Sequence, residues 1–119
     1  MSALRGIRGA VQAPEDTAAA IDAATRELLR AMVERNGIDP ATVAAIWFTQ
    51  TPDLAAAHAA AAARALGWRH FPLLGAQESS VDGQMPRVVR ALMLAPVPDG
   101  RSVRHAYLGA AQGLREDLS

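Results

Sequence analysis

Four polar residues stand in otherwise apolar, strand-like stretches of this sequence, and their types are the ones that could do chemistry. They are Arg8, Glu78, Arg90 and Tyr107. Arginine binds carboxylates through paired hydrogen bonds and keeps its proton, and a glutamate accepts a hydrogen bond from a hydroxyl. No general base or nucleophile accompanies them, so any reaction must depend mainly on positioning and charge stabilisation. The four residues are compatible with a site for a small anion with two acidic groups.

A purely structural interpretation of the same residues is also open. In it, Arg8 and Arg90 are surface charges or members of ion pairs, Glu78 is their partner, and Tyr107 is a half-buried core ring. Because a charge in a buried strand is costly unless it is paired, Arg90 either lies on a hydrated face or faces an anion. Periodicity by itself favours the structural interpretation.

The stretches around the two arginines predict strands. Residues 87–94 contain β-branched valines and are bounded by prolines, with Arg90 in the middle. Residues 4–11 alternate so that Leu4, Gly6 and Arg8 share one face. Two glycines in a strand weaken it and often mark the close approach of a ligand or another backbone.

The remaining elements give the order β-α-β-α-β-β-β, which predicts an α+β (mixed α/β) fold with helices packed on a mixed sheet. Acidic residues after Pro14 predict a helix that ends at Asn36-Gly37. The length of 119 residues predicts one domain, 1–119, with a loosely ordered tail at about 110–119. The other expected elements are a short turn from Asp39-Pro40, a central strand at 43–49, an alanine-rich helix at 55–66, a strand at 68–74 continued to 78, a turn at 96–100 and a strand at 103–108.

Composition excludes several classes of protein. The formal net charge is zero, which argues against a nucleic-acid partner held by bulk electrostatics. There is no cysteine, so disulfides, zinc–thiolate sites and thiol catalysis are excluded, and a cytoplasmic location is favoured. No apolar run is long enough to span a membrane, and the N-terminus does not resemble a signal peptide.

Catalytic motifs of the common enzyme classes are missing as well. The sequence has no GxSxG, Walker, GxGxxG or HExxH pattern. Its three histidines, His58, His70 and His105, lack the spacing of metal ligands, so we expect no metal site.

Short segments spread over the chain carry a resemblance to a known family. The chain resembles the small α/β-type bacterial chorismate mutases, a homotrimeric family distinct from the all-helical chorismate mutases. The resemblance covers nearly the full length, because many short segments occur in the right order. These segments are 5–10, 51–54, Gly67-Trp68, Gln77-Glu78, Val81 with Gly83, Arg90, Arg104-His105, Tyr107-Leu108, Leu114-Arg115 and Asp117-Leu118.

The resemblance implies a function and an assembly. It implies the conversion of chorismate to prephenate by an intramolecular Claisen rearrangement, in phenylalanine and tyrosine biosynthesis, without a cofactor, metal or covalent intermediate. It also implies a homotrimeric pseudo-α/β-barrel with sites in the clefts between subunits. A rival from another class remains: a non-catalytic trimeric module that binds small organic dianions.

The resemblance also assigns roles to residues. Arg90 is implied to contact the ether oxygen, where negative charge develops, Arg8 and Tyr107 the carboxylates, and Glu78 the ring hydroxyl. We therefore expect Arg90 to lie in a cleft without a full protein counter-ion. Further implied substrate-binding residues are Arg64 near the entrance, backbone at Leu74 and Gly75, His58, Leu114, and Arg115 as a group that closes the site.

Some positions depart from the family pattern. His58 stands where phenylalanine is usual, Ala61 replaces a lysine, and Gly75 replaces a cysteine. The loop before Gly67 is one residue shorter, and Pro86 is unusual at the entry to its strand. None of these positions belongs to the four central residues, so we expect them to change affinity more than activity.

Overall fold

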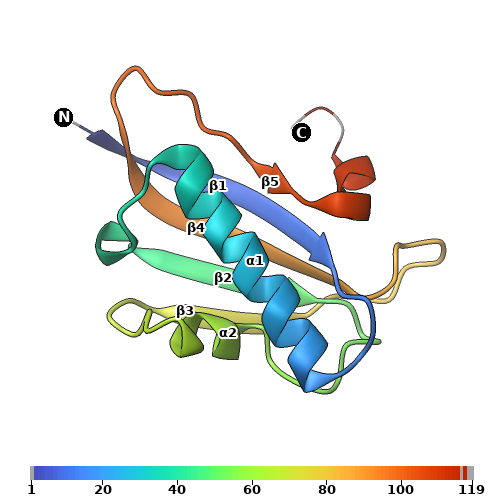
Figure 1. Ribbon diagram of the computed structural model, residues 1–119. Coiled ribbons are helices and arrows are strands. Elements are labelled where there is room, and N and C mark those ends of the chain that lie inside the picture. The colour runs from blue at the N-terminus through green and yellow to red at the C-terminus, as the bar shows by residue number, and fades with distance from the viewer. Residues whose placement is uncertain (1, 116, 118–119) are drawn as a thin grey trace.

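A five-stranded mixed sheet forms the centre of the molecule, and its strands are arranged in the order β3-β2-β4-β1-β5 (Figure 1). The computed structural model describes residues 2–115 and 117. Strand β4 pairs antiparallel with β1 and with β2, whereas β1–β5 and β2–β3 are parallel pairs. The predicted α+β class and element order are confirmed. The strands are β1 Ser2–Gln12, β2 Ala45–Gln50, β3 Leu73–Gln77, β4 Val88–Pro98 and β5 Ala106–Tyr107.

The long helix α1, Ala18–Asn36, lies across one face of this sheet (Figure 1). Its N-cap is Thr17, whose hydroxyl accepts the N–H of Ala20 at 3.1 Å, and it ends at Gly37 with φ of 60°. The expected start near Pro14 is wrong by about one turn. Among the described residues, no helix is long and apolar enough to cross a membrane.

Gly9 allows α1 to pack closely on β1. A Cβ at this position would lie 2.8 Å from Leu28 Cδ1 and 2.9 Å from Met32 Sδ, and 3.1 Å from the carbonyl oxygen of Ala106. A side chain here would force these groups apart. The prediction that a glycine of this strand marks a close approach is therefore confirmed, and the neighbours are α1 side chains and the β5 backbone.

The alanine-rich helix is shorter than predicted. Helix α2 is Ala60–Ala65, and residues 55–59 are not helical. Side chains outside this segment bind its backbone. Asp16 accepts the N–H groups of Ala55 and Ala56 at 3.0 Å, and Gln50 bonds the backbone of Leu54, Ala57 and Ala59. These bonds replace the helical ones that alanine propensity favours. The turn predicted after Asp39 is confirmed as a 3₁₀ helix, η1, Pro40–Thr42.

All five strands differ from the prediction in at least one boundary, and the differences are largest in β3, β4 and β5. Residues 68–72 precede β3 rather than forming part of it, since Pro72 has no N–H for pairing. Strand β4 continues through the expected turn to Pro98. The pairing of β4 with β2 ends at Leu94. The backbone groups of Pro96 and Pro98 point to the same side as those of Leu94, beyond the end of β2, so the N–H that each proline lacks is not needed for strand pairing. The last strand shortens to β5, two residues long.

The segment after β5 contains a 3₁₀ helix, η2, Gly109–Leu114. Its Ala111 is buried in a small apolar cluster with Ala10, Val88 and Tyr107. Part of the segment expected to be loosely ordered therefore packs on the face of the sheet opposite α1. Residues 116, 118 and 119 of that segment lie outside the described residues.

Candidate active site

The sheet face opposite α1 carries the predicted site residues. Residues that are paired across neighbouring strands point to the same face of the sheet. The pairs Arg8–Leu92, Ala10–Arg90 and Thr49–Arg90 therefore place both arginines on the face opposite α1. Tyr107 of β5 pairs with Ala10, so it lies on the same face as the two arginines. Strand pairing thus brings Arg8, Arg90 and Tyr107 together from three strands.

A hollow of about 470 Å³ lies over these residues, and we call it the arginine hollow. Its walls combine three arginines, one tyrosine and apolar residues, a composition suited to a compact anion with an apolar ring. Five predicted site residues therefore line one hollow. Its lining residues are Arg8, Gly9, Trp47, Thr49, Arg90, Ala91, Leu92, Tyr107, Leu114 and Arg115.

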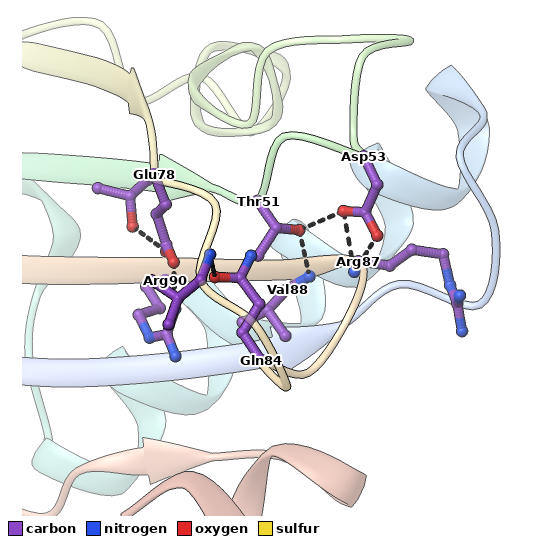
Figure 2. Close-up of polar contacts among 9 residues, drawn as sticks. Thr51, Asp53, Glu78, Gln84, Arg87, Val88 and Arg90 are labelled. Atoms are coloured by element: carbon purple, nitrogen blue, oxygen red, sulfur yellow. Dashed lines mark hydrogen bonds and ion pairs between the residues drawn. The ribbon is translucent and has the colours of Figure 1, made fainter.

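Glu78, directly after β3, is paired with Arg90 (Figure 2). Arg90 Nη1 lies 2.5 Å from Glu78 Oε1, and the Thr49 hydroxyl donates to Glu78 Oε2 at 2.6 Å. The expectation that Arg90 lacks a protein counter-ion is wrong, because β2 and β3 place the carboxylate beside the guanidinium. The contact uses one nitrogen and one oxygen, and the Arg90 side chain is 42% exposed. Other N–H donors of Arg90 therefore remain available to a ligand.

The other predicted site residues lie away from the arginine hollow, beyond β2. His58 and Gly75 line a second hollow of about 440 Å³ together with Gln50 and the loop 54–59. Arg64 of α2 lines a third, with Arg69, Phe71 and Leu73. Leu74 of β3 is 61% exposed. Within one chain, six of the ten predicted residues thus lie in or beside the arginine hollow, and the other four lie at separate places beyond β2.

The structure adds residues that sequence reasoning missed. Trp47 and Thr49 alternate along β2, so they share the face of Arg90, and this spacing was a signal that could have found them. His105 is the third: its Nδ1 accepts the backbone N–H of Arg8 at 2.9 Å. No local pattern could have revealed this bond, because it joins β1 to the residue before β5.

The His105 ring acts as an acceptor in this bond, so it must be neutral at Nδ1. Partial burial, followed by the positive charges of Arg8 and Arg115, lowers the pKa of His105 from its ordinary 6.5. In the pH range between the lowered pKa and 6.5, the unfolded chain binds more protons than the folded one. The contribution of neutral His105 to the free energy of unfolding is therefore complete above pH 6.5, and it is lost as the pH falls from 6.5 through the lowered pKa.

We expect the free energy of unfolding to decrease between about pH 7.5 and about pH 5.5, and to decrease less in His105→Asn. Asparagine offers an oxygen acceptor near the Nδ1 position but does not ionise. Urea unfolding followed by circular dichroism at both pH values measures the difference. An equal decrease in the two proteins would contradict this role of His105.

No metal site accompanies the arginine hollow in the described residues. They contain no group of three or more histidine, aspartate, glutamate or cysteine side chains that could hold a metal ion. The donors that meet at the hollow are guanidinium and hydroxyl groups, which bind anions.

An α+β sheet with helices on one face and an arginine-lined hollow on the other is the architecture expected of a small anion-binding protein. The family model for chorismate mutase type I matches residues 4–118, and the chain belongs to this family. The resemblance found in the sequence is thereby confirmed.

Two relatives and one solved structure agree with this assignment. Chorismate mutase AroH of Thermus thermophilus is 51% identical over 118 residues, which is 97% of this chain and 96% of the relative. Chorismate mutase AroH of Bacillus subtilis strain 168 is 38% identical over 119 residues, 98% and 93% of the two chains. A chorismate mutase structure from Clostridium thermocellum matches with a TM-score of 0.86 and 36% identity, covering 92% of this chain and 98% of the other.

Proposed function

We propose that this protein converts chorismate to prephenate by an intramolecular Claisen rearrangement in aromatic amino-acid biosynthesis. The observation that carries the proposal is the family match over residues 4–118, together with 51% identity to a chorismate mutase. Family membership makes the protein an isomerase. The arginine hollow offers a place where a dianion of chorismate's size can bind.

Arg90 is the residue that we expect to lower the barrier. As the C–O bond breaks, negative charge develops on the ether oxygen, and a fixed cationic donor binds that transition state better than the substrate. The contact with Glu78 fixes Arg90 before substrate arrives. The pair therefore serves preorganisation, and the guanidinium does not have to be ordered during the reaction.

The other residues of the arginine hollow bind the substrate in its reactive shape. Arg8, Tyr107 and Arg115 supply donors for two carboxylates, and Leu114 supplies apolar wall. Glu78, held by Thr49, retains acceptor capacity for the ring hydroxyl. The rearrangement transfers no proton to the protein, so binding, orientation and charge stabilisation suffice without a cofactor.

We propose further that the single domain assembles as a homotrimer with sites between subunits. The face opposite α1 exposes large apolar side chains: Leu4, Trp47 and Leu92, with Leu74 on the neighbouring strand. A contiguous apolar surface of this kind is typical of an interface. The assembly would unite the two groups of site residues: the arginine hollow of one chain would face His58, Arg64, Leu74 and Gly75 of the next. A cytoplasmic location fits this role.

A direct test follows the loss of chorismate absorbance with purified protein. We expect turnover without added metal or cofactor, with prephenate as the product, and no change on addition of a chelator. Binding of a dicarboxylate transition-state mimic without turnover would instead support the non-catalytic dianion-binding module. The mimic should raise the melting temperature in either case, so turnover is the deciding measurement.

A further inference from the structure

Arg87 has a backbone conformation that is unusual for a residue with a side chain. Its φ is 54°, and among the described residues it is the only one besides glycines with a positive φ. This left-handed region crowds Cβ against the backbone, so a residue other than glycine stays there only where its neighbours hold it. Arg87 directly precedes β4, so whatever holds it also sets the entry to the strand that carries Arg90.

The carboxylate of Asp53 holds Arg87 from one side. The N–H of Arg87 donates to both oxygens of Asp53, at 3.1 and 3.0 Å (Figure 2). On the other side, the carbonyl of Arg87 accepts the N–H of Ala13 at 2.7 Å, and its Nε donates to the carbonyl of Ala13 at 3.0 Å. The last bond explains why arginine can occupy a conformation that favours glycine.

Thr51 connects Asp53 to the first residue of β4. Its hydroxyl donates to Asp53 Oδ1 at 2.5 Å and accepts the N–H of Val88 at 3.0 Å (Figure 2). The backbone N–H of Thr51 donates to the carbonyl of Val88 at 3.0 Å. Thr51 is 1% exposed, so the bond between its hydroxyl and the N–H of Val88 is shielded from water. The end of β2 thereby fixes the start of β4.

The start of β4 in turn determines where the guanidinium of Arg90 lies. Arg90 stands opposite Thr49 of β2, whose hydroxyl holds Glu78 beside it. Because side chains alternate along a strand, a rotation or shift at the entry displaces Arg90 from both Glu78 and the hollow. We propose that Asp53 is a positioning residue for Arg90 that acts through Thr51 and Arg87. This inference rests on the proposed function, and Asp53 itself does not line the arginine hollow.

The test replaces the carboxylate and measures kcat and KM separately. Asp53→Asn should lower kcat about tenfold or more and change KM less than about threefold, because Arg90 acts mainly on the transition state. The matched control is Asp39→Asn, which also weakens a carboxylate bond to a backbone N–H, that of Ala41 at 3.0 Å. Asp39 precedes β2, whose first residue pairs with Leu94 of β4 and not with the start of that strand. The control should leave kcat unchanged even where it lowers the melting temperature.

A second substitution separates positioning from general stability. Glycine adopts a positive φ without strain, so Arg87→Gly in the Asp53→Asn background should restore kcat at least about threefold. If Asp53→Asn does not fold, Thr51→Val tests the same connection, because it removes the hydroxyl between Asp53 and Val88. Unchanged kcat in the folded variant, or no recovery in the double variant, would overturn the inference.

A structural measurement distinguishes failure of this inference from failure of the proposed function. If the wild-type protein does not turn over chorismate, the proposed function fails, and crystal structures of wild type and Asp53→Asn then decide about positioning. Displacement of Arg90 from Glu78 in the variant would support the role of Asp53. An unmoved guanidinium would refute it.

Discussion

Replacing Arg90 by alanine should lower kcat for chorismate by about 10²- to 10³-fold, or about 3–4 kcal/mol of transition-state stabilisation. KM should change much less, because the interaction strengthens mainly as charge develops on the ether oxygen. Arg90→Lys should fall between alanine and wild type, since it keeps the charge and loses the planar fork. Initial rates of chorismate loss at several substrate concentrations measure both constants.

A surface arginine provides the control for this substitution. Arg26 lies on α1, away from the arginine hollow, and forms a half-exposed pair with Asp22. Arg26→Ala should keep kcat within about twofold of wild type, because Arg26 does not line the arginine hollow. Removing Arg90 also leaves Glu78 without its partner, so the melting temperature must be measured beside the rate. A folded Arg90→Ala protein with near-wild-type kcat would disprove the mechanism.

Mixing two inactive variants should restore activity if each site is shared between subunits. Arg90→Ala damages the arginine hollow, and Arg64→Ala damages the group of residues beyond β2. Each shared site needs an intact arginine hollow from one chain and an intact Arg64 from the next. In randomly mixed cyclic trimers of the two variants, about a quarter of the interfaces have both. Each variant alone should be nearly inactive, and the mixture, unfolded and refolded together, should regain about that fraction of wild-type turnover.

The control mixture combines two variants that both damage the arginine hollow. Arg8 and Arg90 line the same hollow of one chain, so Arg8→Ala mixed with Arg90→Ala leaves no interface with an intact arginine hollow. This mixture should show no gain over its components. If the first mixture also equals the sum of its parts, the two groups of residues do not meet across an interface, and the shared-site proposal fails.

Local patterns in the sequence were sufficient for much of the fold. The alternation in β1 placed Arg8 and Gly6 on one face of the strand, and Asn36-Gly37 identified the end of α1. Such patterns depend on neighbours two to four residues apart, which the sequence displays directly. The same reasoning overestimated α2, because residues 55–59 bond to side chains outside the segment, and one of these, Asp16, is about forty positions away.

The candidate site shows the same division between local and distant information. The sequence by itself identified which residue types could bind a dianion, and its motifs identified the family that the comparisons confirmed. Only the tertiary structure showed that Glu78 pairs with Arg90, that His105 accepts a bond from Arg8, and that Asp53 holds Arg87. These contacts join residues between 12 and 97 positions apart. They depend on the register between strands, which the folded sheet fixes and which no local period in the sequence encodes.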